Sequence, residues 1–202
     1  MNVLTPQTPE AWNAYVRSFA GWDIYYLCEY AVSMQLHGDG EPLLLCFEHG
    51  AERMCYVVMR SDIADDPRFH GLLPAGRLFD LETPYGYGGP LTDAPLSPEA
   101  QQIFMEELRA YCLEQRIVTQ FLRYHPLLDN HGAVSPMTDT RYLRDTIYMD
   151  TASPELILAN MDSKNRNMVR KAQRSGVTVR KEPMSEYAPF LELYRQTMDK
   201  HS

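Results

Sequence analysis

The chain has 202 residues, of which 45% are hydrophobic and 23% are charged. This is the composition of an ordinary globular protein, and it excludes a disordered or fibrous chain. The length exceeds that of one average domain and allows a sizeable core without disulfides or metals. The formal net charge of −8 argues against general affinity for DNA or other nucleic acids.

Neither a membrane span nor a signal peptide is expected from the sequence. The longest aliphatic run, over 43–47, is far shorter than the ~20 residues of a membrane-spanning helix. Residues 1–12 hold no Lys or Arg and no apolar stretch. We therefore expect a soluble, cytoplasmic protein.

Three helix starts share one signal, a Ser or Thr followed by Pro and Glu. The signals begin at Thr8, Ser97 and Ser153. The hydroxyl oxygen can cap the helix, Pro suits the first helical position, and Glu is favourable at the positive end of the helix dipole. We therefore predict a helix after each signal, and the first of these helices ends at Gly21.

Apolar runs between these helices predict strands. After the first helix we expect a helix over 23–37, strands over 43–47, 54–59 and 78–81, a helix over 98–115 and a strand over 117–124. The first two strands flank a short polar turn, which predicts an antiparallel hairpin. This order of elements predicts an α/β (α+β) fold in which helices cover a mixed sheet.

The last part of the chain offers fewer elements. Residues 125–139 are predicted to be a connection because they include Pro126, Gly132 and Pro136. After it we expect a strand over 142–150, a helix over 154–174, a strand over 177–180 and a helix over 186–199. This block of about 57 residues could bury too little surface to be a stable domain by itself. It packs onto the first domain, is completed by a partner chain, or belongs to a truncated protein, and we favour truncation.

No catalytic nucleophile or metal site is predicted. The four cysteines form no CxxC pair and lie among aliphatic or aromatic residues, so we expect buried, reduced thiols and no disulfide. The six histidines show no HExxH motif and no Cys/His ligand spacing, so we expect no metal. The chain also lacks a GxSxG motif, a P-loop and a GxGxxG motif after a strand. The catalytic residues therefore stay unknown.

The helix predicted over 154–174 is strongly basic. The segment 155–181 has seven basic residues against two acidic ones, a net charge of +5, so the rest of the chain carries −13. Leu158 and Met161 share one apolar arc with Met168, and Arg166 and Arg170 lie on a basic stripe on the opposite side. The stripe is either a phosphate-binding surface or a solvated face whose cations suit the helix dipole.

A loop rich in glycine and tyrosine is the second candidate feature. Residues 84–90 read Pro-Tyr-Gly-Tyr-Gly-Gly-Pro and are followed closely by Asp93. The glycines allow a ligand to approach the backbone, and Tyr85 and Tyr87 offer flat faces with hydroxyl groups that suit sugars or peptides. The alternative is a tight turn with packed tyrosines.

Three motifs carry a resemblance to a known family. The run from Lys164 to Ala172, with Gly176-Val177 behind it, resembles the K-x-R-N…R-K-A…G-V signature of Fem-type proteins, the FemABX-like branch of the GNAT acyltransferase superfamily. The segment 85–93, with its G-P-x-x-D ending, resembles a loop late in the first GNAT-like domain of these proteins. The segment 121–126 resembles the F-x-R-x-H-P strand end of the acetyltransferase members. The resemblance as a whole extends from about residue 23 to the end of the chain.

The resemblance implies two GNAT-like domains, here over 1–140 and 141–202, with an acceptor groove between them. The family's acceptors are amino groups on peptidoglycan precursors or other glycoconjugates, and its donors are aminoacyl-tRNA or an acyl-coenzyme A such as acetyl-CoA. In this superfamily the donor-binding loop lies beyond the point where this sequence ends. We therefore expect an incomplete second domain and no cofactor bound within this fragment.

The resemblance also suggests which residues bind substrate. It implies that Tyr87 and Asp93 lie in the acceptor groove, and that Lys164, Arg166 and Asn167 lie at the domain junction. Tyr85 of the loop and Arg170 of the basic stripe join them as candidate substrate-binding residues.

The leading hypothesis is a fragment, inactive alone, of a cytoplasmic acyltransferase that transfers an aminoacyl or acetyl group to an amine of a peptidoglycan or surface-glycan precursor. Direct attack by a neutral amine needs orientation, a proton acceptor and hydrogen bonds to the oxyanion, but no covalent intermediate. The alternative is a non-catalytic GNAT-like module that binds a glycan precursor, tRNA or a protein partner. A third possibility is that the stripe is only solvated and the loop only a turn. If the chain ends at Ser202, the apolar residues of the last helix favour a homodimer.

Overall fold

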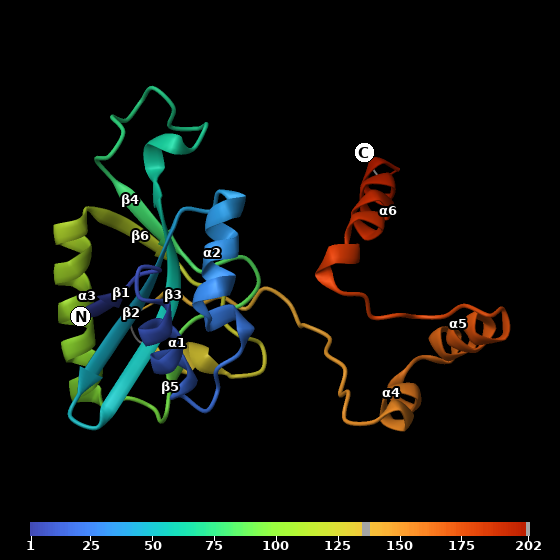
Figure 1. Ribbon diagram of the computed structural model, residues 1–202. Helices are drawn as coiled ribbons and strands as arrows, with labels where there is room; N and C mark the ends of the chain where they lie inside the picture. The colour runs from blue at the N-terminus through green and yellow to red at the C-terminus, as the bar shows by residue number, and fades with distance from the viewer. Residues whose placement is uncertain (135–137, 201–202) are drawn as a thin grey trace. The chain divides into compact units, whose positions relative to one another are not determined.

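The computed structural model describes residues 1–134 and 138–200, so Pro136 of the predicted connection and Ser202 lie outside the described residues. The chain forms two compact units, Met1–Thr146 and Ile147–Ser202 (Figure 1). Each unit is described by itself.

The first unit is a mixed sheet with helices on both faces. Its elements are β1 (Asn2–Leu4), α1 (Pro9–Arg17), the 3-10 helix η1 (Ile24–Tyr26), α2 (Cys28–His37), β2 (Glu41–His49), β3 (Glu52–Asp62), η2 (Ile63–Asp65), β4 (Phe79–Glu82), β5 (Leu91–Thr92), α3 (Pro98–Gln115), β6 (Ile117–Phe121) and η3 (Asn130–Ala133). The strand order is β1-β2-β3-β4-β6, with β5 paired to β3. β4 and β6 are parallel, whereas the other strand pairs are antiparallel. The predicted α+β fold with a mixed, helix-covered sheet is therefore confirmed.

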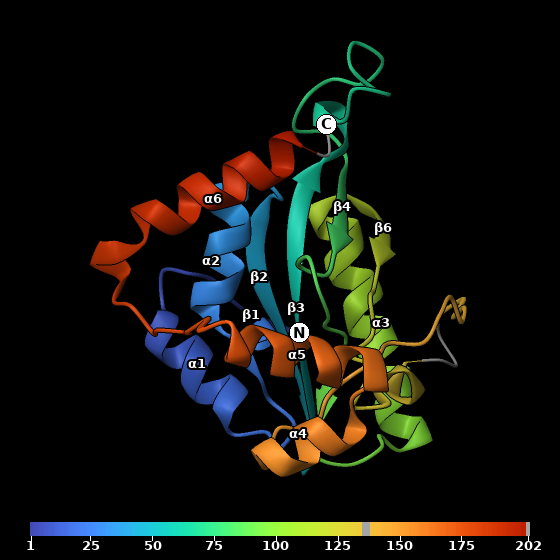
Figure 2. The same cartoon turned by 90° about the vertical axis from the view of Figure 1, so that its right-hand side faces the viewer.

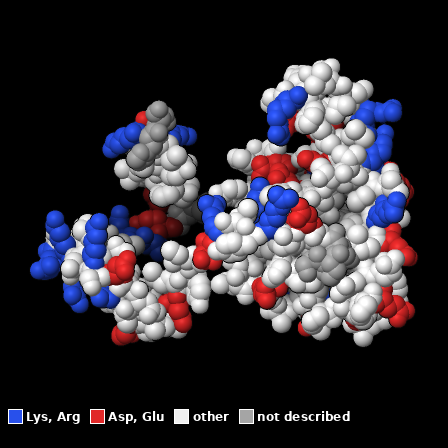
Figure 3. Space-filling model, turned by 180° about the vertical axis from the view of Figure 1, so that it is seen from behind, with Lys and Arg blue, Asp and Glu red and all other residues white. Residues whose placement is uncertain are grey.

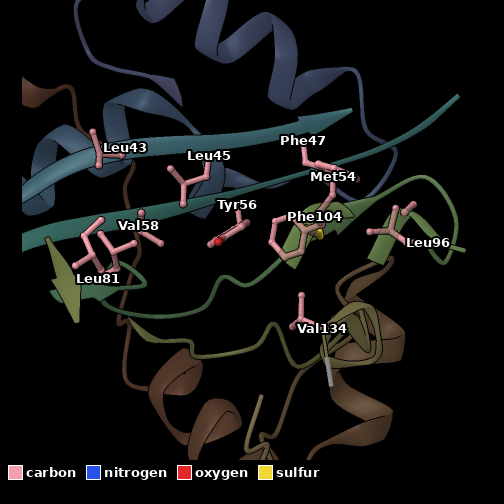
Figure 4. Close-up of a cluster of buried hydrophobic side chains, with 12 residues drawn as sticks. Leu43, Leu45, Phe47, Met54, Tyr56, Val58, Leu81, Leu96, Phe104 and Val134 are labelled. Atoms are coloured by element: carbon pink, nitrogen blue, oxygen red, sulfur yellow. The ribbon is translucent and has the colours of Figure 1, made fainter. Parts of the chain in front are cut away.

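Two apolar cores lie on opposite faces of this sheet. α1 and α2 cover one face and α3 covers the other (Figure 2). Along β2, Leu43 and Leu45 belong to the core on the α3 side (Figure 4), whereas Leu44 and Cys46 belong to the core on the α1 and α2 side. Because the strand is buried on both faces, its sequence is a continuous apolar run and does not alternate.

The predicted β2–β3 hairpin is confirmed, and both of its strands are longer than expected. β1 was not predicted; it is a short edge strand that pairs with Leu44–Cys46 of β2. β6 ends at Phe121, three residues before the predicted end, because the backbone N–H of Arg123 donates instead to Thr83 Oγ1 (2.9 Å).

The helix starts follow the predicted capping signal at two of three positions. The Oγ atoms of Ser97 and Ser153 each accept a hydrogen bond from a backbone N–H of the first helical turn. Thr8 makes no such bond, so the predicted cap is wrong there. The predicted helix over 23–37 is split, because Asp23 caps η1 by accepting from the Tyr25 N–H and Leu27 is extended (ψ 147°).

The second unit holds α4 (Pro154–Asn160), α5 (Ser163–Arg174), the 3-10 helix η5 (Met184–Glu186) and α6 (Ala188–Asp199). The continuous helix predicted over 154–174 is wrong, because the backbone of Met161 is extended (ψ 147°) and separates α4 from α5 (Figure 1). Leu158 and Met161 therefore do not share one helical arc with Met168.

The strands predicted over 142–150 and 177–180 are also not formed. Ile147 and Val179, the apolar residues that suggested them, are almost fully exposed. A strand forms only where a neighbouring strand accepts its hydrogen bonds, and the described part of the second unit contains no strand.

Candidate functional site

The loop rich in glycine and tyrosine, residues 83–90, leaves the sheet between β4 and β5. Both strands pair with β3: β4 pairs with the C-terminal end of β3, and β5 pairs with its N-terminal end. The loop therefore spans the distance along β3 between these two pairings. The Thr83 N–H donates to Phe121 O (3.0 Å), and the Gly88 N–H donates to Arg123 O (2.9 Å). The loop is therefore fixed at both ends against the end of β6.

Two glycines let this loop pack closely against aromatic rings. Gly86 has φ +100°, and a Cβ there would lie 2.6 Å from Cε1 of Tyr25. Gly89 has φ +84°, and its Cβ would lie 2.9 Å from Cδ1 of Tyr124. Any side chain at either position would be strained and would displace a ring. The glycines of the loop thus serve close packing against aromatic rings, as well as the access of a ligand to the backbone that the sequence suggested.

Asn130 holds the loop from the inside. Its Nδ2 donates to Gly88 O (2.8 Å), Pro90 O (3.1 Å) and the Tyr26 hydroxyl (3.2 Å), and its Oδ1 accepts from the His125 N–H (3.0 Å). The Tyr26 hydroxyl in turn donates to Gly88 O (3.0 Å). Burial raises the pKa of Tyr26, so this hydroxyl stays protonated and able to donate.

A buried histidine and an aspartate meet beside the loop. The Leu127 N–H donates to Nδ1 of His125 (3.2 Å), which assigns the ring proton to Nε2. That Nε2–H donates to Oδ2 of Asp23 (2.7 Å), whose Oδ1 accepts from the Tyr25 N–H (2.8 Å). Both ring nitrogens are engaged, so His125 fixes the position of its neighbours and has no free lone pair for proton transfer.

These contacts assemble what we call the tyrosine cluster: Tyr25, Tyr30, Tyr85, Tyr87 and His125. Ring centroids are 5.6 Å apart for Tyr25 and Tyr87, 5.9 Å for Tyr87 and His125, and 5.1 Å for Tyr25 and Tyr30, all in edge-to-face geometry. The Tyr30 hydroxyl donates to Tyr85 O (2.7 Å), and the Tyr85 side chain is 75% exposed. Tyr85 is the exposed member of the cluster, whereas Tyr25, Tyr30 and Tyr87 are half-buried and the Tyr87 hydroxyl lies 3.4 Å from Thr146 Oγ1. The exposed Tyr85 ring, backed by these aromatic side chains, is a surface suited to a sugar ring or a peptide.

Asp93 lies at the end of β5 and is engaged in a separate contact. Its carboxylate accepts from Nε of Arg53 (2.5 Å), and this guanidinium also donates to Ser18 O (2.8 Å) and lies over the ring of Phe19. Arg53 of β3 thus links Asp93 to Ser18 at the C-terminal end of α1. The predicted role of Asp93 in acceptor binding stays a prediction.

The four basic-helix candidates, Lys164, Arg166, Asn167 and Arg170, lie on α5 in the second unit. Lys164, Asn167 and Arg170 are exposed, as phosphate-binding side chains must be. The basic groups of α5 gather on one stretch of surface in Figure 3. Their substrate contacts stay predictions.

Arg166 has a role that the sequence did not suggest. Its Nη1 donates to the carbonyl oxygens of Leu158 (3.3 Å), Ala159 (3.2 Å) and Met161, and its Nη2 donates to Ser163 Oγ (3.1 Å). These carbonyls belong to the end of α4 and have no partner within that helix. Arg166 therefore caps α4 and fixes the bend into α5.

We expect Arg166→Ala to raise the amide hydrogen-exchange rate of α4 about fivefold, the effect of losing roughly 1 kcal/mol of hydrogen bonding. Arg170→Ala is the matched control, because Arg170 is exposed on the same helix and its side chain has no hydrogen bond among the described residues. Hydrogen exchange read by mass spectrometry compares the two variants. Equal exchange in α4 for both would contradict the capping role.

Sequence reasoning missed several residues of this site. Asp23, Tyr25, Tyr30 and Asn130 were not named as site residues, and His125 appeared only within the F-x-R-x-H-P motif. Asp23 had a usable signal, because it is a capping residue placed directly after a helix end. Asn130 had none for its contacts with the loop and with Tyr26, since these partners lie about 40 and 104 residues away in the chain; its remaining partner is the His125 N–H, five residues away.

Residues capable of covalent or metal chemistry are not evident near the tyrosine cluster. Burial raises the pKa of the Cys46 thiol to about 12 and that of Cys55 well above its ordinary value, so both stay protonated. Cys28, Cys46 and Cys55 are buried as expected, whereas Cys112 is only half-buried. In residues 1–134 and 138–200, no group of three or more His, Cys, Asp or Glu could hold a metal ion.

Within the part of the chain that the structure describes, no helix is long and apolar enough to cross a membrane.

Comparison with known proteins gives a match to a family model. A family model described as the FemAB family matches residues 128–202. The match covers less than half of the chain, includes α4, α5 and α6, and supports a FemAB-like relationship. It contains the four α5 candidates but not the loop over 83–90. No curated protein and no solved structure matches the chain.

Proposed function

We propose that this protein is a GNAT-type acyltransferase that transfers an aminoacyl or acetyl group to an amino group of a peptidoglycan or surface-glycan precursor. The observation that carries the proposal is the FemAB family match over 128–202, which contains the K-x-R-N run. The tyrosine cluster adds a surface of the right chemistry for a glycopeptide acceptor. Both kinds of donor are found in the cytoplasm, which we propose as the compartment.

The two units contribute different parts of this function. Tyr85 and Tyr87 hold the acceptor sugar or peptide, and Asp93 orients its polar groups. The exposed cations of α5, Lys164 and Arg170 among them, bind phosphate groups of acetyl-CoA or aminoacyl-tRNA. The amine then attacks the donor carbonyl directly: the new N–C bond replaces the C–S bond of acetyl-CoA or the C–O ester bond of aminoacyl-tRNA, and the amine proton ends on the departing thiol or tRNA hydroxyl. Catalysis therefore rests on orientation and on hydrogen bonds to the oxyanion.

Acceptor binding can be tested on the chain as it stands. The probe is a muramyl pentapeptide carrying uridine diphosphate, titrated by calorimetry. Tyr85→Ala should weaken its binding about tenfold, or about 1.4 kcal/mol, because an exposed aromatic face is lost. Tyr142→Ala is the matched control, since its side chain is 77% exposed against 75% for Tyr85. Equal affinities for the wild type and the Tyr85→Ala variant would sink the proposed acceptor site.

One observation favours a second candidate, a module that binds the same acceptor without catalysis. Both nitrogens of His125 are engaged, so the tyrosine cluster itself offers no free base. Incubation of the probe with acetyl-CoA, or with aminoacyl-tRNA, followed by mass spectrometry separates the two functions. Modified probe supports the acyltransferase, whereas tight binding without modification is the outcome that the binding module and an acyltransferase fragment inactive alone both predict.

A further inference from the structure

The loop between β3 and β4, residues 63–78, projects beyond the end of the sheet (Figures 1 and 2). It is a folded structure, held at its base by the Asp62 carboxylate, which accepts from the N–H groups of Ala64 (3.0 Å) and Gly76. The Ile63 N–H donates to Leu78 O (3.1 Å) across the same base. The loop therefore presents its tip in a defined position.

Two successive turns shape the tip, residues 67–77. The Phe69 N–H donates to Asp66 O (2.9 Å), and the Leu72 N–H donates to Phe69 O (2.9 Å). These turns leave Phe69 39% exposed and Leu72 74% exposed, with Pro74 and Ala75 exposed beside them. Large apolar side chains of the tip are thus exposed to water.

The charges of the loop are arranged by sign. The tip contains Arg68 and Arg77 and no acidic residue, whereas Asp62, Asp65 and Asp66 all precede it. Asp66 pairs with Arg68 (2.5 Å), but the Arg68 side chain remains 81% exposed. Figure 3 shows the projecting loop as a mostly uncharged surface with basic groups at its sides.

We propose that this tip docks on the surface of an anionic lipid bilayer. Phe69 and Leu72 enter the boundary between headgroups and acyl chains. Arg68 and Arg77 contact anionic headgroups. Amphipathic segments that lie in the membrane interface bind with the same combination of apolar and basic side chains. The tip itself carries no acidic residue, and salt at about 0.1 M screens the repulsion between the lipid surface and acidic groups that lie more than about 10 Å away.

The size and shape of the tip favour lipid over a protein partner. A stable protein interface needs about 20–30 residues on each side, whereas the tip is a single convex loop. A fluid bilayer can accept such a small convex surface without a complementary groove. The inference goes beyond the proposed acyl transfer and uses none of the tyrosine cluster.

Vesicle flotation of the whole chain tests the proposal. Vesicles of phosphatidylcholine alone are compared with vesicles of equal parts phosphatidylcholine and phosphatidylglycerol, at about 0.1 M and about 0.5 M salt. We expect binding to the anionic vesicles, weakened by salt, and a loss of at least about fivefold in the double variant Phe69→Ser/Leu72→Ser. Leu36→Ser is the control, because Leu36 is an equally exposed leucine on α2.

The basic helix α5 is the rival lipid-binding surface, so Arg170→Glu/Lys171→Glu is measured in parallel. Vesicle binding lost in this variant but kept in the tip variant would overturn the proposal. No vesicle binding by the wild type would also overturn the proposal. If, in that case, the tip variant self-associates less than the wild type in sedimentation velocity, the tip is a protein contact. A second readout is Leu72→Trp, whose emission should shift to the blue and be quenched by brominated lipid. An unchanged spectrum with bound vesicles would place the tip outside the bilayer.

Discussion

Replacing Trp12 by alanine should lower the free energy of unfolding of the first unit by about 3–5 kcal/mol. Trp12 is fully buried in the core between the sheet and helices α1 and α2. Its Nε1–H also donates to Tyr26 O (2.9 Å), so the variant leaves a cavity and an unpaired carbonyl. Urea unfolding followed by circular dichroism measures the effect.

The other tryptophan is the control for this experiment. Trp22 is 39% exposed and contacts the guanidinium of Arg17 at the surface. Trp22→Ala should therefore cost under about 1 kcal/mol. Similar losses in the two variants would show that the α1 and α2 side of the sheet is not a packed core.

The core was predictable where the apolar pattern is unambiguous. The run Leu43–Leu45 predicted a strand, and its continuity reflects burial on both faces of the sheet. The same reasoning failed over 142–150, where a similar apolar pattern is exposed and forms no strand. A periodic pattern records what a segment could bury; a strand also needs a neighbour that completes its hydrogen bonds.

The break at Met161 shows a related limit. A helical wheel over 154–174 places the apolar residues of this segment on one arc. The wheel assumes a continuous helix, so the periodicity of the sequence does not reveal a break within the segment. The guanidinium of Arg166 stabilises the interruption, because it donates hydrogen bonds to the α4 carbonyls that the next turn of a continuous helix would otherwise have bonded. A basic residue expected to bind substrate thus has a second, local role.

The candidate site was partly predictable for a similar reason. Tyr85 and Tyr87 were found because the local sequence of the loop is unusual, with three glycines and two tyrosines within five residues. Residue 23 was interpreted only as the start of a helix, and Asn130 was not found, because the contacts of Asp23 with His125 and of Asn130 with Gly88 join residues far apart in the chain. Local pattern therefore identified the surface of the site but not the residues that hold it in place.

Replacing Asn130 by alanine should cost about 2–3 kcal/mol of stability and weaken binding of the muramyl pentapeptide probe at least tenfold. The change removes the donors to Gly88 O and Pro90 O and the acceptor for the His125 N–H. Each lost bond costs about 1 kcal/mol, and the loop then loses its fixed position. Asn160→Ala, at the exposed end of α4, is the control and should change neither quantity.

The variant Asn130→Asp tests the direction of these bonds, because it keeps the shape and the acceptor but replaces the amide donor. At neutral pH a carboxylate would face the carbonyl oxygens of Gly88 and Pro90, so its pKa should be raised in the folded protein. A carboxyl group whose pKa is higher in the folded than in the unfolded protein contributes stability that is fully present below the unfolded pKa. This stability is lost as the pH rises through the folded pKa. Relative to the wild type, Asn130→Asp should therefore be more stable near pH 4 than near pH 7, since the protonated carboxyl can donate again. A difference in unfolding free energy that does not change with pH would show that the Nδ2 donors do not hold the loop.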